Sequence, residues 1–314
     1  ASNGGGGIYA TNTETISGST IKGNTVVSAG QYEGGGGIYI DSAMTILNST
    51  ISGNAVTVAG GITYAGGGGI YNNSGLTMAG STVSGNVVLG SGGTGSGGGG
   101  IFSYDSVSMI NSTINGNRSS MDGGGYMTYQ VYSNVLSNVT LYQNSATGSG
   151  GNIANPSPDT ITLTNTIVAG GSAGTGADID NGGVITSGDY NIVQTAVVGT
   201  ALTGTTTHNV TANPLLLALT NNGGPTFTDA DTSASPGRAD IPFSGGMCNG
   251  VTGTNVDQRG FARGAGARCD AGAYEFAGVA GAIRQHPTPA RGNHHHQHRA
   301  RAHRNPALPT SATR

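Results

Sequence analysis

Short apolar runs separated by Gly, Ser and Asn recur along residues 1–171 of the chain. One copy contains Ile38–Ile40, then Met44–Leu47, then a third run around Ile51. Apolar positions do not recur every three or four residues, so the pattern favours short β-strands over amphipathic helices. Short strands that return with a fixed period are typical of one turn of a parallel β-helix per repeat.

Two sequence blocks recur in phase and define this period. The first, GGGGIY or GGGGIF, occupies 4–9, 34–39, 66–71 and 97–102, with weaker copies at 123–126 and 150–153. The second is STISGN or a close variant, and its last residue gives the series Asn24, Asn54, Asn86, Asn117 and Asn144. We therefore predict an all-β chain that forms a right-handed, single-stranded parallel β-helix of about six coils over residues 1–171. Residues 172–276 are predicted to contain continuing coils and a β-rich C-terminal closing segment.

Stacked coils place equivalent residues above one another, about 4.8 Å apart. Two inward-facing ladders are expected, because β-branched side chains suit stacked strand positions. The first consists of Ile8, Ile38, Ile70 and Ile101, and the second of Ile21, Ile51, Val83, Ile114, Leu141 and Ile167. The asparagine series is expected to form a ladder at a turn, with side-chain amides bonded along the stack.

Three features are candidate surface elements. An aromatic column is able to stack on sugar rings, although stacking between coils is the favoured interpretation; it consists of Tyr9, Tyr39, Tyr71 and Phe102. The loops 25–33, 55–65, 87–96 and 118–122 vary, and insertions in solenoids often form the binding face. A threonine column is interpreted as structural, because it is not a flat two-column array of the ice-binding kind; it consists of Thr20, Thr50, Thr82, Thr113, Thr140 and Thr166.

Charge divides the chain in two. Residues 1–276 contain all 15 acidic residues but only 6 of the 12 Lys and Arg, so this body lacks the basic stripe that nucleic-acid binding needs. Residues 277–314 contain the other 6 Arg and no acid, and their Arg, His and Pro content predicts a disordered basic tail. A shifted reading frame is an alternative origin for that tail. No run of about 18 apolar residues occurs, so no transmembrane helix is predicted.

The carboxylates give little support for catalysis. Glycosidases need two carboxylates about 5–9.5 Å apart, yet no two acidic residues fall in adjacent coils of one column. Asp178 and Asp180 form an i, i+2 pair that could share a face, and a solvated loop pair is the favoured interpretation. No metal or cofactor motif is present, so neither is expected. The sequence leaves enzyme activity open but favours its absence.

The two cysteines, Cys248 and Cys269, lie outside any C-x-x-C motif. A single disulfide in an exported protein is the favoured interpretation, and two free thiols are the alternative. The charged residues around them are expected to form an ion-pair cluster; they are Asp257, Arg259, Asp270 and Glu275.

Two families resemble parts of this chain. The paired GGGI and I-x-G-N elements resemble the repeats of bacterial polymorphic outer-membrane proteins, which carry GGxI and FxxN, with Ile, Val or Leu here in place of Phe. The later residues are similar to secreted bacterial β-helix proteins of the choice-of-anchor type, at NPLL (213–216), TNNGGPTFT (220–228), DQRG (257–260) and CDAGAYE (269–275). GRAD at 237–240 departs from that family, which has Ala-Ile-Asp after Ser-Pro. The resemblance covers residues 1–276 and implies export, a cell-surface or extracellular location and a segment that closes the helix, but no particular reaction.

These observations favour a non-catalytic, secreted or cell-surface scaffold that is monomeric and adhesin-like. We expect it to bind a surface polymer or carbohydrate, and no nucleic acid, through its lateral face and variable loops. A polysaccharide lyase or glycoside hydrolase is the first alternative, and a structural spacer is the second. An exposed aromatic or polar strip beside the loops favours the adhesin, a carboxylate cluster favours the enzyme, and a bland surface favours the spacer. The chain opens inside a repeat, which favours further coils upstream.

Overall fold

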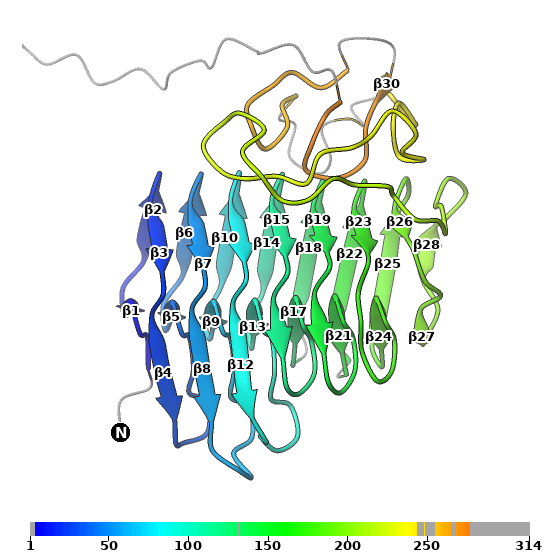
Figure 1. Ribbon diagram of the computed structural model, residues 1–314. Helices are drawn as coiled ribbons and strands as arrows, with labels where there is room; N and C mark the ends of the chain where they lie inside the picture. The colour runs from blue at the N-terminus through cyan, green and yellow to red at the C-terminus, as the bar shows by residue number, and fades with distance from the viewer. Residues whose placement is uncertain are drawn as a thin grey trace, which may run out of the picture. The chain divides into compact units, whose positions relative to one another are not determined.

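The computed structural model of the protein describes residues 4–130, 132–156, 158–243, 248, 255–264 and 268–276. These residues form a parallel β-solenoid of about six turns, with a small antiparallel sheet at the C-terminal end and no helix (Figure 1). The all-β fold class predicted from the repeats is therefore confirmed. Within this described part, no helix is long and apolar enough to cross a membrane. The tail predicted over 277–314 lies outside the described residues.

Each of the first five turns contributes one strand to each of four parallel sheets, which we name A to D in chain order, and the later turns contribute none to sheet D. Sheet A contains β1 (Ile8–Ala10), β5 (Ile38–Ile40), β9 (Ile70–Asn72), β13 (Ile101–Ser103), β17 (Tyr126–Thr128), β21 (Ile153–Asn155), β24 (Ile179–Asn181) and β27 (Val198–Gly199). Sheet B contains β2 (Glu14–Ser17), β6 (Met44–Leu47), β10 (Leu76–Ala79), β14 (Val107–Ile110), β18 (Ser133–Ser137), β22 (Thr160–Thr164), β25 (Val184–Gly188) and β28 (Thr203–Thr205).

Sheets C and D complete the coil. Sheet C contains β3 (Thr20–Lys22), β7 (Thr50–Ser52), β11 (Thr82–Ser84), β15 (Thr113–Asn115), β19 (Thr140–Tyr142), β23 (Ile167–Ala169) and β26 (Ile192–Val193). Sheet D contains β4 (Thr25–Ser28), β8 (Ala55–Val58), β12 (Val87–Gly90), β16 (Arg118–Ser119) and β20 (Ser145–Ala146). The antiparallel pair is β29 (Ile241–Pro242) with β30 (Arg268–Cys269).

The register of the sheets follows the sequence repeat. The isoleucines of sheet A pair in the order Ile8, Ile38, Ile70 and Ile101. The corresponding apolar residues of sheet C pair in the order Ile21, Ile51, Val83 and Ile114. All of these side chains except Ile8 are buried, so each column contributes one continuous stripe to the core.

The predicted alignment is wrong by one residue in the last sequence repeat. Leu141 pairs with Val168, whereas the sequence alignment placed Ile167 beside it. The cause is Thr166, whose hydroxyl donates to the carbonyl of Thr164. Ser112 does the same to Ile110, so Thr166 stands in the serine column that precedes the threonines.

The asparagine series forms a hydrogen-bonded ladder between sheets C and D. The side-chain oxygen of Asn86 accepts from both the backbone N–H and the side-chain amide of Asn54, each at 2.9 Å. Asn86 donates in the same way to Asn117 and also to the carbonyl of Ile51. The same bonds connect Asn24, Asn54, Asn86, Asn117 and Asn144, and the ladder continues through Asn152 to Asp178.

The glycine block makes room for this ladder. A Cβ atom on Gly69 would lie 3.0 Å from the side chain of Asn86. One on Gly66, where φ is +150°, would overlap the carbonyl oxygen of Gly97 in the next coil. The glycine and asparagine blocks therefore stay in phase because the coils are closely stacked at this point.

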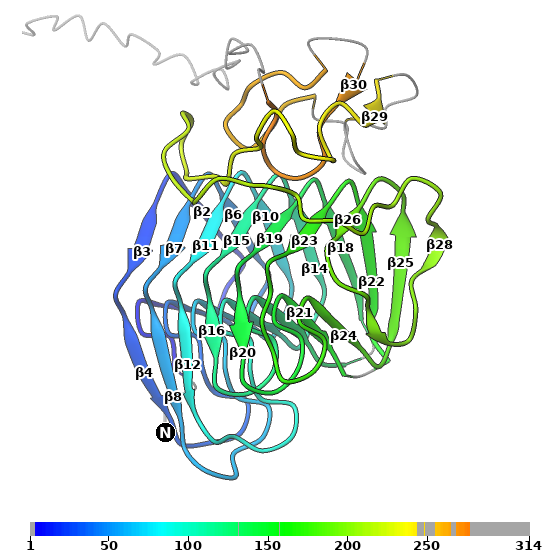
Figure 2. The ribbon, with the colours of Figure 1, turned by 45° about the vertical axis from the view of Figure 1, so that its right-hand side comes forward.

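Residues 206–210 continue the last coil, where Val210 bridges Ile192 of sheet C. The described residues of 211–276 lie over the turns between sheets B and C and against sheet C, and we call them the lateral cap (Figures 1 and 2). The Gln258 side chain donates to Thr82 at 2.9 Å and accepts from Thr113 at 2.7 Å. The backbone N–H of Ala273 donates to the hydroxyl of Thr140 at 3.0 Å. Instead of only closing an end, the segment therefore covers three members of the threonine column from the side.

Candidate functional site

The aromatic column predicted from the sequence lies mostly under other residues. Its ring centroids are 5.2, 4.9 and 5.0 Å apart from Tyr9 through Tyr39 and Tyr71 to Phe102. Tyr9 is 43% exposed, but the other three rings are at most 1% exposed. In the second to fourth coils these rings therefore stack on each other and do not face solvent.

Loops between sheets D and A cover this column, and Figure 2 shows them extending beyond the ends of β4, β8 and β12. The hydroxyl of Tyr39 donates to the carbonyl of Tyr32 at 3.0 Å, and that of Tyr71 donates to the carbonyl of Tyr64 at 3.0 Å. Each of these two buried tyrosines thus holds a loop in place by bonding the backbone of a second tyrosine. The ring of that second tyrosine does not belong to the column.

These second tyrosines have an unusual backbone. Tyr32 and Tyr64 have φ values of 59° and 56°, in the left-handed region. For a bulky residue this conformation costs about 1–2 kcal/mol. Gly95 holds the same place before its glycine block, with φ of 72°, and glycine adopts that conformation without strain.

The outer rings gather into a surface cluster, the tyrosine patch, formed by Tyr32, Tyr64, Tyr104 and Tyr129. The ring centroids of Tyr32 and Tyr64 are 5.3 Å apart in a stacked arrangement, and those of Tyr32 and Tyr104 are 5.2 Å apart in an edge-to-face arrangement. Tyr129 lies 5.0 Å from Tyr64. Tyr32 is 37% exposed and the other three are half-buried. Burial, followed by contact with Tyr32, raises the pKa of Tyr104 to about 12, so its hydroxyl is neutral at physiological pH.

A polar row leads into the tyrosine patch. Asp41, Asn73 and Tyr104 each follow a strand of sheet A in successive coils, about 4.8 Å apart. The carboxylate of Asp41 is exposed and accepts from Asn73 at 3.1 Å and from Tyr9 at 3.3 Å. At the far end of the row, the Gln130 side chain donates to the Tyr104 hydroxyl at 2.5 Å.

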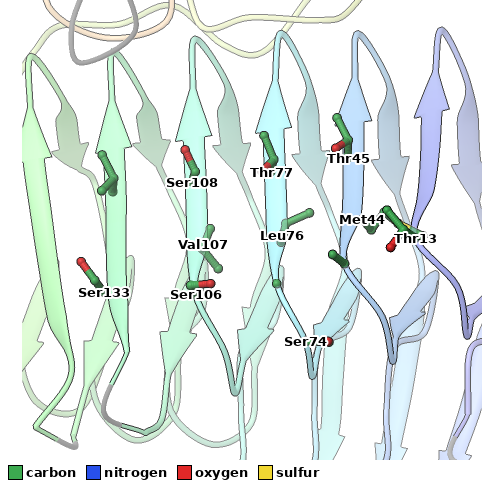
Figure 3. A pocket seen from close by; sticks show the side chains of 13 residues that line it. Thr13, Met44, Thr45, Ser74, Leu76, Thr77, Ser106, Val107, Ser108 and Ser133 are labelled. Carbon is green, nitrogen blue, oxygen red and sulfur yellow. The ribbon is translucent and has the colours of Figure 1, made fainter.

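The outer face of sheet B offers a contrasting surface. Its groove has a volume of about 360 Å³ and is lined by small, hydroxyl-bearing and aliphatic residues, with no charged side chain among its lining. Figure 3 shows Thr45, Thr77 and Ser108 on three successive strands beside it. This groove has neither an aromatic ring nor a carboxylate to orient a ligand.

The candidate catalytic pair does not form a joint site. Asp178 is fully buried, and one of its oxygens accepts from Asn152 and Gly171, both at 2.8 Å. The other oxygen accepts from the backbone and the hydroxyl of Thr195. Asp178 therefore terminates the asparagine ladder, while Asp180 lies in β24 and is half-buried. No cluster of His, Cys, Asp and Glu suited to a metal ion occurs in the described ranges.

The charged residues of the lateral cap stabilise its fold. Arg259 pairs with Asp257 at 2.6 Å, and the fully buried Arg263 lies 3.6 Å from Glu275. Burial, and then the charge of Asp270, raises the pKa of Glu275 to about 7. Cys248 and Cys269 are joined by the predicted disulfide.

Two groups of residues were not singled out from the sequence. The tyrosine patch had a usable signal, because Tyr32 and Tyr64 both stand two residues before a glycine block. The second group joins His208 to Asp189 at 2.6 Å, with the imidazole stacked on Tyr190 at 4.6 Å. No motif connects these residues, since the chain brings them together only by folding.

Searches against protein-family models, curated protein sequences and solved structures found no match for this chain.

Proposed function

We propose that the protein is a non-catalytic, secreted or cell-surface scaffold that binds a polysaccharide through the tyrosine patch. The observation that carries this proposal is the surface cluster of four tyrosines beside the Asp41–Asn73 row. Aromatic rings pack on the apolar faces of sugars, while carboxylates and amides bond sugar hydroxyls. A solenoid repeats such groups along its axis, which suits a linear polymer.

The backbone strain supports this role. Glycine at Tyr32 and Tyr64 would relieve the left-handed conformation, as Gly95 does in the next loop. Both loops nevertheless carry a large ring; that of Tyr64 packs partly against the buried aromatic column, while Tyr32 is 37% exposed. Backbone strain retained at two exposed or half-buried rings supports a role for their outer faces in surface contacts.

Two further observations support the proposed location. Disulfides persist mainly in oxidising compartments, and the Cys248–Cys269 bond fits an exported protein. The resemblance of the repeats and of residues 213–275 to secreted and surface β-helix proteins supports the same placement.

Binding is tested by incubating the full chain with insoluble cellulose, chitin, xylan and peptidoglycan, and measuring the protein that sediments. We expect retention on at least one polymer. The double variant Tyr32→Gly, Tyr64→Gly should bind it at least about tenfold more weakly, at about 1 kcal/mol for each ring. Glycine preserves the two backbone carbonyls that hold the loops and relieves the left-handed strain, which offsets the lost ring packing, so a cooperative urea transition should remain.

Thr77→Ala in the groove of sheet B is the matched control and should leave binding unchanged. Soluble reducing ends are measured in the same tubes. Their release by the wild-type chain would make the protein an enzyme, and full retention of the tyrosine variant would remove the patch as the binding site. No retention on any polymer would favour the structural spacer.

A further inference from the structure

We infer that the tyrosine patch takes a positively charged sugar polymer, built from hexosamine units that carry free amino groups. This inference rests on the proposed function and names the substrate class of the same surface.

The charges of the solenoid favour a cationic ligand. Residues 4–205 contain nine acidic residues but only two basic ones, Lys22 and Arg118. Lys22 belongs to β3 in sheet C and Arg118 to β16 in sheet D, whereas the patch lies over sheet A. On the sheet A side, Asp105 follows Tyr104 directly, and Asp41 lies two coils before Tyr104 in the polar row, both in turns that lead to sheet B.

The tyrosine rings and the Asp41 carboxylate also favour a positively charged ligand. The face of a tyrosine ring attracts an ammonium group through its quadrupole, by about 0.5–1 kcal/mol at an exposed site. A carboxylate has about four lone-pair positions, and Asp41 uses two of them for Tyr9 and Asn73. Within the described residues the other lone-pair positions of the Asp41 carboxylate are left for an ammonium group of a ligand that lies on the polar row.

The sheet beneath the patch argues for a sugar chain rather than a basic peptide. An extended peptide gains affinity by adding a strand to a free sheet edge. The strands below the patch, β5, β9 and β13, are each paired on both sides within sheet A. A ligand there can contact only the protein's side chains, because the backbone of these strands is already paired. Those side chains are aromatic rings and polar groups, which suit a sugar.

The test compares two oligomers of equal length and the same backbone, one fully N-acetylated chitin and the other fully deacetylated. Binding to the full chain is measured at a pH where the free amines are charged, at low and at high salt. We expect the deacetylated oligomer to bind about fivefold more tightly or better, and salt to reduce this preference.

Asp41→Asn should remove most of the preference, and because an amide still bonds sugar hydroxyls it should weaken the deacetylated oligomer much more than the acetylated one. Asp180→Asn makes the same charge change on sheet A, three strands beyond β13, and should have no effect. The control for the patch itself is Tyr32→Gly, Tyr64→Gly, which should weaken both oligomers.

The outcomes separate the two proposals. Equal affinity for both oligomers, lost in the tyrosine variant, would overturn the charge preference and retain the proposed function. A preference that survives Asp41→Asn would overturn the role of the polar row. Binding of polylysine with neither oligomer bound would overturn this inference in favour of a basic peptide ligand, and it would overturn the proposed function as well if none of the insoluble polymers retains the protein.

Discussion

Asn86 connects three coils through one small side chain. It is fully buried, yet its oxygen and its amide are both bonded, to Asn54, Asn117 and Ile51. A buried polar group without a partner costs about 1–3 kcal/mol, so the ladder stabilises the stack only while it is continuous. It also fixes the register, because a coil displaced by one residue would leave several amides unpaired.

Asn86→Ala should therefore lower the free energy of unfolding by about 3 kcal/mol. The change removes the acceptor for two N–H groups of Asn54, and it removes the side-chain amide that donates to Asn117 and to the carbonyl of Ile51. Asn24→Ala is the matched control, because within the described part of the chain Asn24 donates to Asn54 and accepts from no other member of the ladder, and it should lose about 1 kcal/mol. Urea unfolding followed by circular dichroism measures both, and equal losses would contradict the ladder's cooperative role.

At the scale of an element, one contact between the lateral cap and sheet C uses a buried carboxyl group, where its charged form is unfavourable. Asp229 is buried, and the side-chain amide of Asn115 donates to its two oxygens at 2.9 and 3.1 Å. Burial raises the pKa of Asp229 to about 7, with the Asn115 bond opposing the shift. The cap therefore carries a protonated carboxyl group at mildly acid pH and a buried charge above neutrality.

This placement predicts a cap that weakens as pH rises. Between about pH 4 and 7 the folded chain holds a proton on Asp229 that the unfolded chain has released, so stability falls by up to about 1.4 kcal/mol per pH unit. Above pH 7 the contribution levels off. Asp229→Asn should flatten this slope in urea titrations, whereas Asp41→Asn, at an exposed carboxylate, should not. An unchanged slope in the Asp229 variant would contradict the assignment.

The elements differ in how far the sequence predicts them. The strands, their columns and the asparagine ladder follow from local constraints that repeat, such as the room that Gly69 leaves for Asn86. The lateral cap depends on contacts such as Gln258 with Thr82, which are 176 residues apart and follow no period. The tyrosine patch depends on two left-handed residues in the loops, and their ring directions cannot be read from a pattern of apolar positions.

At the scale of the whole molecule, the cap supports only part of the stack. It bonds Thr82, Thr113 and Thr140 in β11, β15 and β19, whereas Thr20 is exposed and Thr50 is half-buried. The disulfide closes the cap on itself and is worth about 3 kcal/mol for a loop of this length. Stability should therefore be lowest in the first two coils.

Hydrogen exchange tests this distribution directly. The amides of β15 and β19 should exchange more slowly than those of β3 and β7, because opening the former requires the cap to detach. Reduction of the Cys248–Cys269 bond should bring the two sets of rates closer. If the two sets of strands exchange at equal rates, both before and after reduction, the cap does not stabilise the stack.

The one-sided cap also gives the molecule a mechanical direction. Tension applied from the N-terminal side first reaches strands that are held only by the strands of the next coil. These strands should detach one at a time at low force. The tension then reaches coils that the lateral cap connects to one another, where many hydrogen bonds must break at once. The chain should therefore extend at low force first and resist extension at higher force later, which suits a molecule that must stay attached to a surface under flow.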